Sequence, residues 1–221
     1  MAPLGLSALR SRLSRGSSGK GWQPPEASWS RSFGLGWQSP FTVRYASNLD
    51  DGPWHGMPLG GFGAGCLGRS SRGDFNLWHL DGGEHWYGSI PDCQFALWEK
   101  QGDQVRVHAL ATEPTRDDSK PESGQPLSSW QWYPASTEET STGTYAARYP
   151  LSWNHYAGVF RAEVSCEAFS PILPGDYQRS SYPVAVFRWT LSNPTNKPLE
   201  LSLLLSWRNT VGWFTNTDSS A

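Results

Sequence analysis

The amino-acid sequence predicts an all-β protein, an antiparallel sandwich of two sheets. Several segments alternate apolar and polar residues with a period of two, as strands with one buried face do. The 221 residues include 23 glycines and 17 prolines, enough for many turns between short strands. No segment combines a sustained 3.6-residue apolar period with capping residues. Together these observations favour a sandwich over helical or parallel α/β architectures.

A hairpin is the first element that the alternation predicts. Residues 104–109, QVRVHA, place apolar side chains on one face and polar side chains on the other. Residues 95–98, FALW, precede them, and Gln101-Gly102-Asp103 has the composition of a hairpin loop. We therefore expect two antiparallel strands joined at residues 101–103.

The C-terminal half contains three further predicted strands. Residues 161–168 alternate, with Ala162, Val164, Cys166 and Ala168 expected to face inward. Residues 184–191 are apolar on both faces except at Arg188, which predicts a strand buried in a two-sheet core. Residues 199–207 place four leucines and Trp207 on one face, and residues 193–198, NPTNKP, form the turn before them.

Charge and cysteine content limit the classes of partner. The formal net charge is −2, so electrostatics favours neither nucleic acid nor anionic lipid as a partner. No apolar run approaches the length of a transmembrane helix. The three cysteines are far apart and form no C-x-x-C motif, as expected of buried thiols in a reducing compartment. The expected location is the cytoplasm, with peripheral membrane attachment left open.

Residues 1–38 are expected to form a disordered or loosely ordered N-terminal arm. The first 22 residues contain four basic side chains and no acid, and they lack the continuous apolar core of a signal peptide. This Arg- and Ser-rich composition also resembles a transit segment, and we prefer the arm. The folded domain is expected to span residues 39–221.

The glycine-rich block Leu59–Trp86 is the most distinctive part of the sequence. It combines eight glycines with aromatic residues, an Arg-Gly-Asp and several acids. Glycine at this density indicates backbone that turns through positive φ or passes close to other atoms. The spacing Gly63-x-Gly65-x-x-Gly68 matches a dinucleotide-binding fingerprint, but turn residues precede it and no helix start follows it. A nucleotide site is therefore rejected.

Two blocks carry a resemblance to a known family. Residues 58–80, PLGGFGAGCLGRSSRGDFNLWHL, resemble the opening block of glycoside hydrolase family 116, which includes bacterial β-glucosidases and non-lysosomal glucosylceramidases. Residues 169–194, FSPILPGDYQRSSYPVAVFRWTLSNP, are similar to a second block of the same amino-terminal domain. The order and separation of the blocks also fit the family.

The resemblance implies that the whole enzyme has two domains with different roles. In family 116 the nucleophile and the acid/base residue lie in a later (α/α)6 domain, so no catalytic residue is assigned to this chain. The whole enzyme would hydrolyse β-glucosides such as glucosylceramide with retention, without a metal or other cofactor. The expected partner of this chain is that helical domain, and the sandwich is expected to be incomplete at its C-terminal end.

Eight residues are candidates for substrate binding or for a domain interface. They are charged residues in tight turns, which usually fix backbone through hydrogen bonds, and aromatic residues that can stack on sugars. The candidates are Arg69, Arg72, Asp74, Trp78, Trp86, Tyr87, Asp176 and Tyr177. We expect the apolar surface for the partner domain near the glycine-rich block and the PGDYQRSS turn. Trp130 and Trp132 are further aromatic candidates.

Other chemistries are weaker interpretations of the same residues. Asp74, Asp81 and Glu84 are close in sequence, but Asp is common in turns, and a structural role is preferred over a catalytic pair. The histidines do not form a four-ligand metal set. A stand-alone lectin-like sandwich and an inactive fragment of a split reading frame remain as alternatives.

Overall fold

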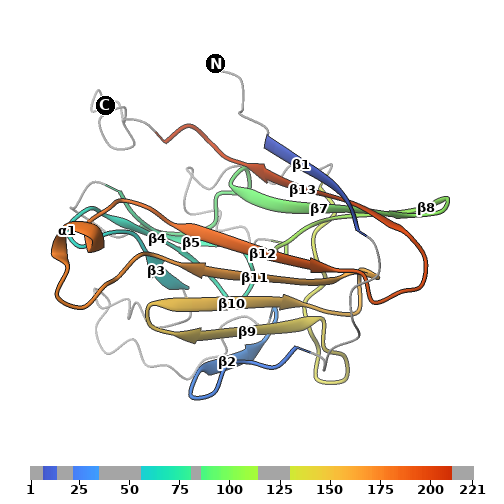
Figure 1. The fold of residues 1–221 in the computed structure, drawn as a ribbon, viewed down its shortest axis with the longest axis horizontal. Helices are drawn as coiled ribbons and strands as arrows, with labels where there is room; N and C mark the ends of the chain where they lie inside the picture. The colour runs from blue at the N-terminus through green and yellow to red at the C-terminus, as the bar shows by residue number, and fades with distance from the viewer. Residues whose placement is uncertain (1–6, 14–21, 35–55, 81–85, 114–129, 211–221) are drawn as a thin grey trace.

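The fold is all-β and antiparallel, as predicted. The computed structural model describes residues 7–13, 22–34, 56–80, 86–113 and 130–210, with residues 7–13 and 87 described by their backbone alone. Within these ranges the only helix is the single turn α1 (Tyr177–Ser180), and the strands are distributed over three sheets (Figure 1).

The first sheet contains the predicted hairpin. Its strand order is β1-β13-β7-β8, with bounds Ser7–Leu13, Leu199–Ser206, Gln94–Gln101 and Gln104–Ala109. Gln101 pairs with Gln104, and Gly102 turns the chain with φ +60°. The hairpin at residues 101–103 is therefore confirmed.

The second sheet confirms the alternation of residues 161–168. Its order is β12-β11-β10-β9-β2, with bounds Val186–Ser192, Glu163–Phe169, Leu151–Tyr156, Gly143–Arg148 and Trp29–Ser32. The four side chains expected to face inward are all buried. The opposite face of β11, with Glu163, Ser165 and Glu167, is less buried.

The third sheet is a meander made from the glycine-rich block. Its order is β3-β4-β5-β6, with bounds Met57–Leu59, Cys66–Arg69, Phe75–His79 and Trp86–Tyr87. Gly63 and Gly65 lie in the β3–β4 turn with positive φ, and Gly68 lies in β4, so no helix follows the glycine spacing. In a meander, successive turns lie at opposite ends of the sheet. The β3–β4 and β4–β5 turns are thus separated by the length of β4.

One aromatic-rich core joins the three sheets. Phe75 packs edge-to-face against Phe187 and Trp207, and Phe95 contacts Trp189. Further buried members come from all three sheets: Trp78, Leu97, Leu199, Leu201, Tyr156 and Val164. Large rings bury more apolar area per residue than aliphatic side chains. The tryptophan content therefore compensates for the modest share of aliphatic residues.

Three segments differ from the sequence-based expectations. Strand β12 is an edge strand whose outer face is open, with Val184 just before it 41% exposed and Val186 37% exposed, so burial on both faces was a wrong prediction. Within the expected arm, residues 7–13 form β1 and residues 29–32 form β2, because each finds an open sheet edge to pair with.

Candidate functional site

The glycine-rich β3–β4 turn packs against the α1 segment, which lies more than a hundred residues away in the sequence. The Phe62 amide donates to the Ser180 carbonyl over 2.9 Å, and the Gly60 amide donates to Ser170 Oγ over 2.6 Å. A Cβ atom on Gly61 would lie 2.4 Å from the Ser181 backbone. Glycine at position 61 is therefore required for this close approach.

The α1 turn is held by Asp176. Its carboxylate accepts from the Arg179 amide over 2.9 Å and from Arg179 Nε over 2.5 Å, so it caps the turn and pairs with an exposed guanidinium. These contacts explain why Asp176 stands in this turn. They leave the neighbouring residue Tyr177 78% exposed.

Exposed apolar side chains gather where these two segments meet. Phe62 is 49% exposed on the glycine-rich turn, and Tyr177 projects from α1. The same segments carry four more exposed apolar residues, and we call the set of six the apolar edge: Phe62, Leu173, Tyr177, Tyr182, Val184 and Val186. Hydrogen bonds from Leu173 to Ser180 and from Ser170 to Val184 tie the segments together. Single exposed apolar residues are common, but a gathering of this kind is typical of a binding surface.

Arg69, another candidate, is buried in the core with 1% of its surface exposed. Its Nε donates to the Gly73 carbonyl over 2.9 Å and its Nη1 to Asn154 Oδ1 over 3.0 Å. Its Nη2 donates to the Leu110 carbonyl over 3.0 Å and to the Tyr156 hydroxyl over 2.5 Å. Burial raises the pKa of Tyr156, so that hydroxyl stays protonated and donates onward to Leu110.

Aromatic rings surround the same guanidinium. Its carbon lies 5.2 Å from the centroid of the Phe95 ring and 5.4 Å from that of Trp189. Neutral acceptors and ring faces thus take the place of a carboxylate as partners of the charge. Arg69 fastens β4 to the second sheet and is inaccessible to a substrate.

Asp74 and Arg72 stabilise the β4–β5 turn. The Asp74 carboxylate accepts from Ser70 Oγ, and Gly73 adopts φ +82° within the turn. Arg72 Nε donates to Thr112 Oγ1 over 3.1 Å, and Arg72 Nη2 donates to the Glu113 carbonyl over 2.6 Å. The charged side chains of the Arg-Gly-Asp tripeptide thus bond to the turn itself and to the segment at residues 112–113.

The structure separates five of the candidates into two groups. Arg69, Arg72 and Asp74 lie at the β4–β5 end of the meander, whereas Asp176 and Tyr177 lie beside the β3–β4 end. The apolar edge lies at the β3–β4 end.

The aromatic candidates also differ in accessibility. Trp78 is 0% exposed, and its indole N–H donates to the Gly88 carbonyl over 2.9 Å, so an exposed position for Trp78 was a wrong prediction. The strand alternation of β5 turns it inward. Trp86 is partly buried against the same core, and the Tyr87 side chain lies outside the described residues. Trp130 and Trp132 stack on one another, with ring centroids 5.8 Å apart.

Sequence reasoning missed one buried acid, Glu99. Its carboxylate accepts from the Arg161 amide over 2.8 Å and the Ala162 amide over 2.8 Å, and it faces the Arg161 guanidinium. The alternation could have predicted this burial, because Glu99 follows Phe95 and Leu97 on the inward face of β7. An acid at an inward position requires hydrogen-bonding partners, which the loop before β11 provides.

The two most buried acids of the described chain thus have structural partners. Asp81 and Glu84, which the sequence placed near Asp74, lie outside the described residues. In the described ranges, no cluster of three or more His, Cys, Asp or Glu side chains could hold a metal ion. No helix in these ranges is both long and apolar enough to cross a bilayer.

Comparison with known families agrees with the glycine-rich block and the β-rich fold. A family model described as "beta-glucosidase 2, glycosyl-hydrolase family 116 N-term" matches residues 56–221. The match begins just before β3 and includes the glycine-rich turn, the α1 segment and most strands of the three sheets. The chain therefore belongs to glycosyl-hydrolase family 116, and it carries the amino-terminal domain of that family.

Proposed function

We propose that this chain is the non-catalytic, amino-terminal part of a retaining β-glucosidase, and that its apolar edge is the surface on which the (α/α)6 catalytic domain packs. The observation that carries the proposal is the gathering of Phe62, Tyr177 and Tyr182 where two distant segments meet. Exposed rings at one site are typical of interface cores, where aromatic residues are enriched.

The construction of this surface supports an interface of fixed shape. The Phe62–Ser180 hydrogen bond and the glycine contact at position 61 hold one segment against the other. Asp176 caps the turn that presents Tyr177. A preorganised surface loses less conformational entropy when a partner binds.

The acids of the described chain support a non-catalytic role. A retaining glycosidase needs two carboxyl groups roughly 5–5.5 Å apart across the scissile bond. Asp74 and Glu99 are buried and bound to turn and loop groups, and Asp176 caps α1. The resemblance places both catalytic carboxyl groups in the helical domain. The substrate that we propose for the whole enzyme is a β-glucoside, with glucosylceramide as its glycolipid form.

The proposal is tested by co-expressing this chain with a tagged (α/α)6 domain of family 116 and measuring co-purification. We expect the double variant Phe62→Ala/Tyr177→Ala to lose capture by about tenfold or more, since centrally placed rings each contribute roughly 2 kcal/mol or more at interfaces. The matched control is Val105→Ala/Val107→Ala, which removes two exposed apolar side chains from β8. Equal loss in the control, or capture unchanged in the test variant, would contradict the proposal.

A further inference from the structure

A pocket of about 500 Å³ opens on the outer face of the second sheet. Its floor is formed by the ends of β10, β11 and β12, where His155 pairs with Ser165 and Ser165 pairs with Thr190. Glu163 and Ser192 form the next cross-strand pair on the same face. The apolar edge contributes none of the lining residues. The pocket is therefore a site distinct from the proposed domain interface.

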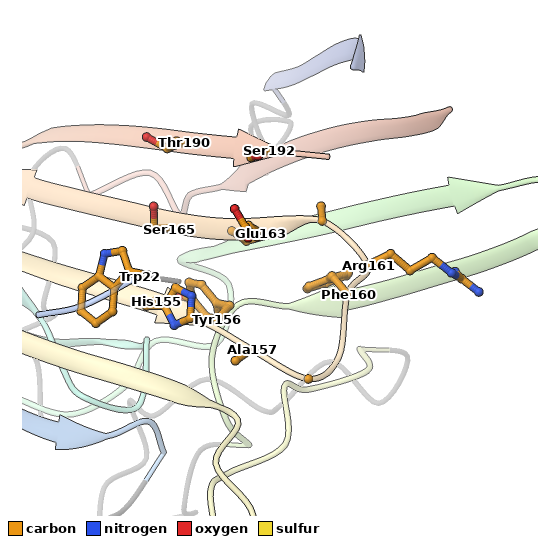
Figure 2. Close-up of a pocket in the computed structure, with 13 residues that line it drawn as sticks. Trp22, His155, Tyr156, Ala157, Phe160, Arg161, Glu163, Ser165, Thr190 and Ser192 are labelled. Carbon is orange, nitrogen blue, oxygen red and sulfur yellow. The ribbon is translucent and has the colours of Figure 1, made fainter. Parts of the chain in front are cut away.

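Two stacked aromatic rings form one wall of the pocket. Trp22 comes from the segment before β2 and stacks on His155, with ring centroids 4.9 Å apart and planes 4° from parallel. Figure 2 shows the two rings next to each other, with Ser165, Glu163 and Thr190 on the neighbouring strands. Stacking fixes the indole at the pocket wall. A fixed indole offers a flat apolar surface to the C–H face of a sugar ring.

Polar groups on the floor have capacity for a ligand. Within the described residues, the Glu163 carboxylate and the hydroxyls of Ser165, Thr190 and Ser192 take part in no side-chain hydrogen bond. Glu167, the next acid on the same face of β11, differs, because it accepts from Trp153 Nε1 over 3.1 Å and pairs with Arg188. Ligand pockets typically combine an apolar wall with a few polar groups that orient the ligand.

The charges of the pocket favour a neutral ligand. Among the described lining residues, Glu163 is the single acid, and the one cation, Arg161, contacts Glu99 and Gln104. Figure 2 shows the Arg161 side chain extending away from Trp22 and His155. An anionic ligand would therefore meet the Glu163 carboxylate and, among the described lining residues, no available cation. A carboxylate and three hydroxyls suit a ligand rich in hydroxyl donors. A single carboxylate also cannot act as a retaining pair.

We propose that this pocket binds a neutral pyranose unit, stacked on Trp22 and hydrogen-bonded by Glu163 and the hydroxyls of β11 and β12. The site would hold a glucoside chain or a glycolipid headgroup without cleaving it. This proposal is independent of the packing of the catalytic domain, because no residue of the apolar edge lines the pocket.

Calorimetric titration of the 221-residue chain with cellobiose tests the proposal. We expect saturable binding that Trp22→Ala and Glu163→Gln each weaken by about tenfold or more. Matched controls are Trp130→Ala, which removes a partly buried tryptophan stacked on Trp132, and Glu138→Gln, which alters an exposed acid in another loop. Both controls should bind as the unmodified chain does.

Vesicles distinguish the two sources of the sugar. Co-sedimentation with phosphatidylcholine vesicles that contain glucosylceramide, but not with plain vesicles, would identify a glycolipid headgroup if Trp22→Ala abolishes it. Binding of cellobiose without such co-sedimentation would identify a free glycan. The proposal is overturned if the unmodified chain binds neither probe, or if Glu163→Gln and a folded Trp22→Ala bind as tightly as the controls. Should Trp22→Ala fail to fold, Glu163→Gln decides alone.

Discussion

At the scale of single residues, Arg69 shows how a charge can be buried without a carboxylate. Its donors are taken up by two carbonyls, an amide oxygen and a phenol, and two aromatic faces lie within 5.4 Å of its guanidinium carbon. Arg69 is the last residue of β4, and its hydrogen bond to the Gly73 carbonyl reaches the turn that follows. The sequence could not predict the partners Asn154 and Tyr156, because they lie more than eighty residues away on another sheet.

Replacing Arg69 with lysine should therefore destabilise the fold strongly. Lysine keeps the charge but cannot reproduce the planar set of donors, so buried acceptors lose their partners. We expect the free energy of unfolding to fall by roughly 2–4 kcal/mol in urea denaturation. Arg179→Lys is the control, since its ion pair with Asp176 is largely exposed and should cost less than about 1 kcal/mol. Similar losses in both variants would contradict the assignment.

His155 gives the stability a pH dependence of defined sign. Burial lowers the pKa of His155 below its ordinary value of 6.5, and the nearby Glu163 opposes this shift in part. The unfolded chain therefore binds a proton first as the pH falls, and stability is lost from about pH 6.5 down to the lowered folded pKa. His155→Gln should flatten the pH dependence of the free energy of unfolding in that window. If His155→Gln leaves the slope of the free energy of unfolding against pH unchanged, groups other than His155 cause the pH dependence.

At the scale of elements, the turns differ in how closely other backbone approaches their glycines. Gly73 has φ +82°, and a Cβ there would lie 2.2 Å from the Leu110 carbonyl oxygen. Gly102 also has positive φ, at +60°, but no atom lies within 4 Å of an added Cβ. A side chain at Gly102 would therefore meet only an unfavourable backbone conformation, whereas a side chain at Gly73 would also clash with the Leu110 backbone.

Alanine substitutions at these glycines should differ in effect. Gly102→Ala should cost only backbone strain, about 1 kcal/mol. Gly73→Ala adds a clash with backbone that cannot move independently of the β4–β5 turn, and we expect a loss of roughly 3 kcal/mol or more. Thermal unfolding of the two variants beside the unmodified chain measures the difference. Equal melting temperatures would contradict the close approach at Gly73.

Periodicity predicted elements well where only one face of a strand is buried. The β7–β8 hairpin and the inward face of β11 followed directly from alternation. It failed at β12, whose apolar outer face suggested burial on both sides although the strand lies at a sheet edge. Alternation reports which faces are apolar but not what covers them. The pairing of β1 and β2 was missed because edge pairing depends on backbone hydrogen bonds more than on side-chain pattern.

At the scale of the whole molecule, one core supports two separate surfaces. The apolar edge lies at the β3–β4 end of the meander, and the Trp22 pocket lies on the outer face of the second sheet. The position of the first surface was expected from the resemblance, because both family blocks contribute residues to it. The pocket could not be predicted, because its residues come from Trp22, from the β10–β11 loop and from three strands that become adjacent only through sheet pairing.

The central claim, that this domain supports catalysis without performing it, is tested most directly by assaying hydrolysis of an aryl β-glucoside. The 221-residue chain alone should give no turnover, and addition of a family 116 (α/α)6 domain should give turnover that depends on the acids of that domain. Asp74→Asn should leave this combined activity in place as far as the chain remains folded, because Asp74 holds a turn. Turnover by the chain alone that is abolished by Asp74→Asn, Asp81→Asn or Glu84→Gln would contradict the account.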